Sequence, residues 1–74
     1  MTEENVELRL TTAEALVLFE WLVAAHDAQG LIADEAEQRV LWDLESQLET
    51  KLVEPLMPDY TELVDAAKRA VLGE

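Results

Sequence analysis

The sequence predicts a mainly α-helical domain built from one short N-terminal β-strand and three helices, with the strand paired across a homodimer. Residues 5–11 alternate strictly between apolar and polar side chains, which is the period-two pattern of a half-buried strand. Capping-box patterns then precede each of the later apolar runs, which have helical spacing. No second strand-like segment is present in the sequence, and one strand cannot satisfy its own backbone groups.

The predicted strand over residues 5–11 places Val6, Leu8 and Leu10 on one side and Glu7 and Arg9 on the other. Pairing with the same strand of another copy would give an antiparallel two-stranded ribbon about a two-fold axis. The alternative is an extended arm that lies on the helices with a solvated backbone.

The first helix is expected over residues 12–29. Thr11 and Glu14 form a T-x-x-E capping box at its start, and Gly30 would end it in the left-handed conformation. Apolar side chains cover most of its circumference, which is more than the roughly 100° arc of an ordinary amphipathic helix. We therefore expect this helix to be central and to have neighbours on several sides. Its length and its acidic residues argue against a membrane span.

The second helix is expected over residues 35–53, with Asp34 as its N-cap and Glu37 completing the box. Apolar residues at helical spacing predict a core stripe made of Val40, Leu41, Leu44, Leu48 and Leu52. Three carboxylates are expected on a solvated acidic face of this helix: Asp43, Glu45 and Glu49.

Two prolines, Pro55 and Pro58, interrupt the helical pattern after the second helix. The third helix is expected over residues 60–72, beginning at a D-x-x-E box with Asp59 as its cap and ending at Gly73. The chain is short enough that residues 1–74 should form a single domain.

The charge balance is strongly acidic, with 17 Asp and Glu against five Lys and Arg and a formal net charge of −12. Direct binding to nucleic acid or to an anionic membrane needs positive charge, so neither is expected. The balance is compatible with simple solubility, with a basic partner or with imitation of a polyanion. The acidic N-terminus differs from the cationic start of a signal peptide, so a cytoplasmic location is expected.

The residues that carry chemistry are few. The chain has one serine, Ser46, one histidine, His26, and no cysteine, so no activated-nucleophile pattern is visible. His26 lies near the end of the first helix, where an imidazolium favours the helix dipole, and a structural role is expected for it. The carboxylates of residues 34–37 lack the alternation of a calcium loop. We expect no catalytic residue, no metal, no cofactor and no enzymatic activity.

The two tryptophans, Trp21 and Trp42, are expected in the core or at a dimer interface, because a small domain needs their bulk. The alternative is that they anchor a different protein. With the apolar side of the strand they complete the candidate interface: Val6, Leu8, Leu10, Trp21 and Trp42.

Residues 10–22, 39–45 and 58–60 together resemble small acidic all-helical bacterial proteins of unassigned function. The resemblance covers about residues 8–71 and rests mainly on caps and core positions. It implies a bacterial, cytoplasmic setting and transfers no activity. We therefore expect a small acidic interaction or accessory protein without catalytic activity that acts as a homodimer. The alternative is a charge-based inhibitor, a DNA mimic or an immunity-type protein, of a basic nucleic-acid-handling protein.

Overall fold

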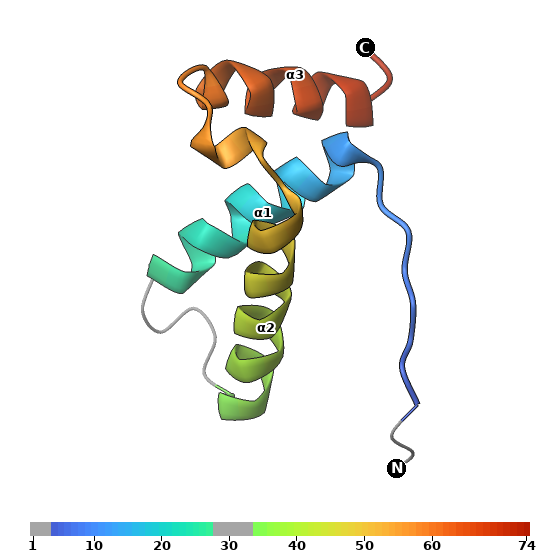
Figure 1. The fold of residues 1–74 in the computed structure, drawn as a ribbon, viewed down its shortest axis with the longest axis vertical. Helices are drawn as coiled ribbons and strands as arrows, with labels where there is room; N and C mark the ends of the chain where they lie inside the picture. Colours follow the sequence, from blue (N-terminus) through green and yellow to red (C-terminus); the bar gives the residue numbers. More distant parts are fainter. Residues whose placement is uncertain (1–3, 28–33) are drawn as a thin grey trace.

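A computed structural model describes residues 4–27 and 34–74 of the chain and shows a mainly helical protein (Figure 1). Its elements, in chain order, are α1 (Thr12–Asp27), α2 (Glu35–Lys51), the 3₁₀ turn η1 (Glu54–Leu56) and α3 (Tyr60–Val71). α1 packs against both α2 and α3, and α3 also contacts η1. The prediction of three helices with the first at the centre is confirmed.

The core lies around α1. Among the described residues the buried apolar side chains are Ala15, Leu16, Phe19, Leu22 and Ala25 from α1, Leu48 from α2, and Val64 and Ala67 from α3. Leu22 is the most deeply buried large side chain, at 2% exposure. Because α1 is apolar on several sides, it can supply surface to two neighbouring helices at once.

The start of α1 follows the sequence closely. The Thr11 amide donates to Oε1 of Glu14 at 2.8 Å, and the Glu14 amide donates to Oγ1 of Thr11 at 3.0 Å. This reciprocal pair confirms the predicted capping box. The predicted end of the helix at residue 29, and the cap at Gly30, lie outside the described residues.

α2 also begins as predicted, because Oδ1 of Asp34 accepts from the Glu37 amide at 3.0 Å. The helix ends at Lys51, two residues before the predicted boundary of residue 53. Leu52 is extended, with a φ of −96° and a ψ of 132°, and this conformation ends the helix. Pro55 only excludes a helix that continues through residue 55. Val40 departs from the predicted core stripe and is 66% exposed.

The two ends of α3 contrast. Asp59 makes no side-chain capping bond, so the predicted third box is wrong. Its φ of −100° and ψ of 28° differ from the extended conformation of an N-cap, although its carbonyl accepts the first helical bond from the Leu63 amide. At the other end Gly73 has a φ of 81° and donates to the Ala70 carbonyl at 3.1 Å. This left-handed glycine ends α3 as the sequence predicts.

Residues 4–11, which we call the N-terminal arm, are extended but form no strand. Figure 1 shows the arm leaving the start of α1 and running alongside α2 without a neighbouring strand. The single chain therefore does not contain the strand predicted over residues 5–11. The physical reason is that residues 4–10 form no backbone–backbone hydrogen bond with any other described residue, and a strand needs such a partner.

Candidate functional site

The arm and α2 enclose a groove of about 610 Å³. Its apolar lining comes from three places: Val6, Leu8 and Leu10 of the arm, Ala15 of α1, and Leu44 and Leu48 of α2 with Leu52 directly after that helix. Leu48 is buried while Leu44 and Leu52 are partly buried, so the floor of the groove is the outer edge of the helical core. One side of the groove is thus firmly packed, and the other is the arm.

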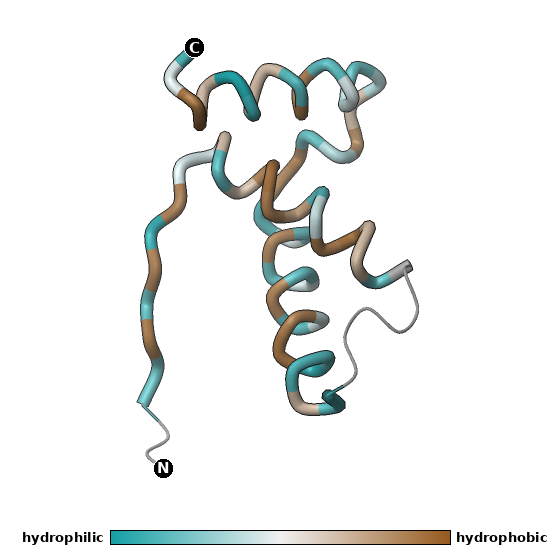
Figure 2. Tube along the Cα trace, turned by 180° about the vertical axis from the view of Figure 1, so that it is seen from behind, coloured by the Kyte–Doolittle hydropathy of each residue, from teal (hydrophilic) through white to brown (hydrophobic). Residues whose placement is uncertain are grey.

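The arm's apolar side chains remain largely in solvent even though they line this groove. Val6 is 86% exposed and Leu8 is 81% exposed, while Leu10 is nearly half exposed. Figure 2 shows the alternation of hydrophobic and hydrophilic residues along the arm. The capping box at Thr11 and Glu14 fixes where the arm leaves α1. The result is an apolar, extended segment whose two backbone edges are both open to pairing.

The accessible surface and the radius of gyration are both larger than those of a compact domain of this length. The accessible surface is 6227 Å² for a mass of 8.3 kDa. A compact monomer of this mass has about 4,600 Å². The radius of gyration is 13.7 Å, against roughly 11 Å for a compact domain of this length.

The groove carries a charge pattern opposite to that of the whole protein. Arg9 and Lys51 line it, and they are two of the five Lys and Arg in the sequence. Among the described residues that line the groove none is Asp or Glu, although the chain has 17 of them. The described lining of this groove is therefore positively charged, although the protein as a whole is strongly acidic.

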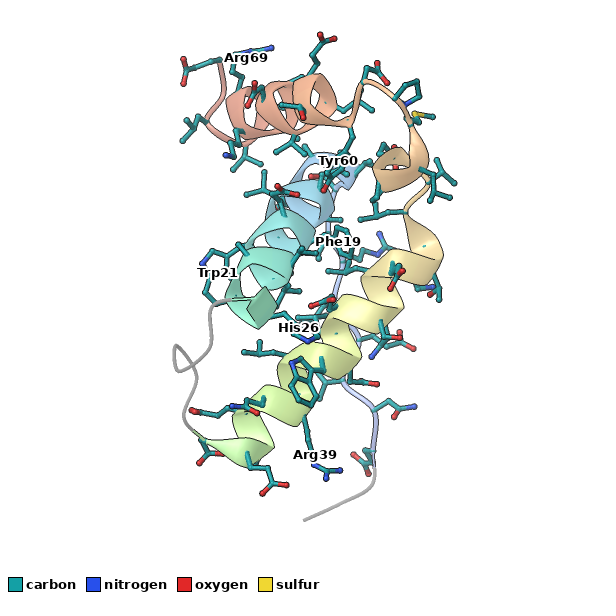
Figure 3. The ribbon with its side chains drawn as sticks, turned by 90° about the vertical axis from the view of Figure 1, so that its left-hand side faces the viewer. Phe19, Trp21, His26, Arg39, Tyr60 and Arg69 are labelled. Carbon is teal, nitrogen blue, oxygen red and sulfur yellow. The ribbon has the colours of Figure 1, made fainter. Side chains whose placement is uncertain are left out.

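The two tryptophans lie outside this groove. Trp21 is 53% exposed and lines a separate shallow hollow with Glu14, Val17, Leu18 and Val71. Figure 3 shows it on the outer side of α1. Trp42 is about half exposed and stacks on His26, with the ring centroids 5.3 Å apart and the planes 26° apart. The structure thus brings Val6, Leu8 and Leu10 together and places the two tryptophans elsewhere.

His26 ties α1 to α2. Its Nδ1 lies 3.4 Å from Oε1 of Glu45, and its ring is stacked on Trp42. In Figure 3 the His26 side chain lies between the two helices. The sequence predicts a structural role for His26 from the helix dipole alone. The structure adds its contacts with Glu45 and Trp42 of α2. Trp42 and Glu45 are three residues apart on α2, so they share a face and can both contact His26.

The predicted acidic face on α2 is wrong as a single surface. Glu45 turns toward His26 and has a side chain only 20% exposed. Asp43 is exposed and accepts from Nε2 of Gln47 at 2.7 Å, and Glu49 is also exposed. Successive helical residues are about 100° apart, so Asp43 lies roughly 160° from Glu45. The three carboxylates therefore do not form one array.

Tyr60 and Glu20 make the only side-chain hydrogen bond between α1 and α3 among the described residues, with the Tyr60 hydroxyl donating to Oε2 of Glu20 at 2.8 Å. Burial, this bond and the charge of Glu20 all raise the pKa of Tyr60 above its ordinary range. Figure 3 shows Tyr60 directed from α3 toward α1. Neither residue lines the groove, so the pair acts as a structural tie.

No helix in the described part of the chain is long and apolar enough to cross a membrane. Residues 4–27 and 34–74 contain no cluster of three His, Asp or Glu side chains placed to hold a metal ion.

Comparison with known proteins gives no relative, because no family model, no curated protein and no solved structure matches the chain. The resemblance to small acidic bacterial proteins therefore stays a prediction. Fold and site together define a small three-helix protein with an unpaired N-terminal arm.

Proposed function

We propose that the protein is a small, non-catalytic interaction protein that works as a homodimer joined through its N-terminal arms. The observation that carries this proposal is the exposure of Val6 and Leu8 beside a groove whose floor is already packed. Burying a Val or Leu side chain contributes about 1.5–3 kcal/mol, so a surface of this kind favours association. A small domain without disulfides gains stability in the same way.

The test compares two aspartate substitutions that change the net charge equally. Leu8→Asp places a charge on the exposed apolar side of the arm. Val40→Asp places the same charge on α2, at an exposed position outside the groove. Sedimentation equilibrium should give a dimer for the unmodified chain and for Val40→Asp, and a monomer for Leu8→Asp. Circular dichroism should show unchanged helix content, because Leu8 makes no part of the core.

A chain that sediments as a monomer at all accessible concentrations would remove the homodimer. A Leu8→Asp variant that stays dimeric would show that the arm is not the joining surface.

The alternative, a charge-based inhibitor of a basic nucleic-acid-handling protein, has less support. Its remaining basis is the net charge of −12, since Asp43, Glu45 and Glu49 do not share one face. It predicts binding to a basic nuclease that weakens steeply as salt is raised. Tight binding of that kind by the Leu8→Asp monomer would favour the inhibitor over the homodimer.

A further inference from the structure

We infer that two copies of the chain pair through their arms as an antiparallel ribbon whose two-fold axis passes through Leu8. The inference rests on the homodimer proposed above and deepens it by naming the occupant of the groove and the register of the pairing. The occupant is the arm of a second copy. That arm alternates apolar with polar residues, so its apolar side matches the apolar lining of the groove.

The register follows from which side chains meet across the ribbon. Centring the pair on Leu8 sets Leu8 opposite Leu8 of the partner subunit, and Val6 opposite Leu10 of the partner subunit. The same register sets Glu7 opposite Arg9 of the partner subunit, and the two-fold axis repeats every pair. Apolar residues then meet apolar residues on one face, and opposite charges meet on the other.

The other registers lose this match. A shift by one residue turns the apolar side of one arm to the opposite face of the ribbon. A shift by two residues sets either Glu7 or Arg9 against its own copy. A parallel in-register pair sets both Glu7 and Arg9 beside their own copies. Like charges directly opposite each other are unfavourable. Of these arrangements, only the antiparallel pair centred on Leu8 gives apolar pairs on one face of the ribbon and oppositely charged pairs on the other.

The ribbon would lie over the groove between the arm and α2. Val6, Leu8 and Leu10 already line the groove, together with Arg9, so the apolar side of the arm borders the groove. In an antiparallel pair the same three residues of the partner subunit lie on that face as well. The ribbon would then cover the floor formed by Leu48 and its neighbours, and the open backbone edge of the arm would gain hydrogen bonds along one side.

Cysteine cross-linking tests the register, because the chain has no native cysteine. Residues directly opposite in an antiparallel pair have Cα atoms about 4.5–5.5 Å apart, which a disulfide can join. Position 6 lies about 13 Å from position 6 of the partner, which it cannot. Leu8→Cys should therefore oxidise to a covalent dimer. Val6→Cys and Leu10→Cys should not do so separately, and should do so when mixed.

Ser46→Cys provides the matched control, since Ser46 is exposed on α2 and measures disulfides formed by random collision. Efficient self-cross-linking of Val6→Cys or Leu10→Cys, at or above the level of Leu8→Cys, would overturn the register while leaving the homodimer intact. A chain that is monomeric by sedimentation would instead overturn the proposed homodimer, so the two failures are distinguishable.

Charge reversal tests the cross-strand pairs independently. Glu7→Lys makes the chain less acidic, so a purely global repulsion predicts a tighter dimer. The register predicts the opposite: two like-charge contacts replace two favourable ones, and the dimer should weaken about tenfold. Asp65→Lys changes the net charge equally at an exposed position on α3 and serves as the control.

Arg9→Glu should weaken the dimer in the same way as Glu7→Lys. A mixture of the two variants should form a heterodimer, because each substituted position then meets an opposite charge in the other chain. Native mass spectrometry distinguishes the heterodimer by mass. A Glu7→Lys dimer that is as tight as the Asp65→Lys dimer, or a mixture that forms no heterodimer in excess of the statistical fraction, would overturn the register.

Discussion

Removing the hydroxyl of Tyr60 should weaken the contact between α3 and α1 by the contribution of its hydrogen bond to Glu20. The hydroxyl donates to Oε2 of Glu20 at 2.8 Å in a partly buried setting. A hydrogen bond to a charged group contributes about 1.5–3 kcal/mol in proteins. Partial exposure places this one at the lower end, so Tyr60→Phe should lower the free energy of unfolding by about 1–2 kcal/mol. For a domain of this size each kcal/mol lowers Tm by roughly 4–8 °C.

Urea unfolding followed by circular dichroism measures this loss at neutral pH. Glu20→Gln is the matched control, because its amide oxygen can still accept from Tyr60 while the charge is removed. The double variant completes a cycle that isolates the coupling between the two side chains. Tyr60→Phe within about 0.3 kcal/mol of the unmodified chain would refute the role given to this bond, since typical errors of additivity are that large.

The same pair predicts the behaviour at alkaline pH. Burial, the hydrogen bond and the charge of Glu20 raise the pKa of Tyr60 in the folded chain. An unfolded tyrosine releases its proton near pH 10, so above that pH the unfolded state is favoured by ionisation while the folded state holds its proton. The stability that Tyr60 contributes is complete below about pH 10 and is lost as the pH rises further. The advantage of the unmodified chain over Tyr60→Phe should therefore shrink above that pH.

Three further predictions concern the core, the caps and the net charge. Leu22 is 2% exposed, so Leu22→Ala should cost about 2–5 kcal/mol in urea unfolding; a loss below about 1 kcal/mol would contradict its central position. Thr11→Ala should cost about 1 kcal/mol and Asp59→Ala less than about 0.5 kcal/mol, because only the first makes a side-chain capping bond. Moderate salt should raise Tm, measured by calorimetry, by screening the net charge of −12; a fall would show that local ion pairs dominate.

Local signals predicted the helix starts well. The capping bonds at Thr11 and Asp34 involve residues only three positions apart, so the sequence contains all that they need. The early end of α2 was not predictable from Pro55, because a proline at that position is compatible with a helix that ends at residue 53. Asp59 shows the limit of this reasoning, since a D-x-x-E pattern caps a helix only if the preceding turn leaves the aspartate extended.

Contacts between elements were not predictable in the same way. α1 is apolar on most of its surface, so its pattern predicted several neighbours but could not say which face each neighbour covers. Leu16, for example, is buried while Trp21 on the same helix is half exposed. The contact of His26 with Glu45 joins residues on different helices, and no local spacing predicts it. The alternation in the arm correctly indicated an extended, two-sided segment, but a sequence pattern does not reveal whether a pairing strand is present.

The distribution of charge allows two such acidic chains to meet. Each copy has a formal charge of −12, and at low ionic strength that repulsion opposes association. The groove, however, is lined by Arg9 and Lys51 and by no carboxylate among its described residues, so the repulsion comes mainly from distant parts of the surface. Distant charges are screened strongly, with a Debye length of about 30 Å at 0.01 M salt and about 8 Å at 0.15 M. Contacts between Glu7 and Arg9 across the ribbon would act at a few ångströms and be screened less. Sedimentation equilibrium should therefore show the dimer tightening as salt rises over this range, whereas a dimer that loosens steadily would mean that attraction between charges, and not the apolar arm, holds the two copies together.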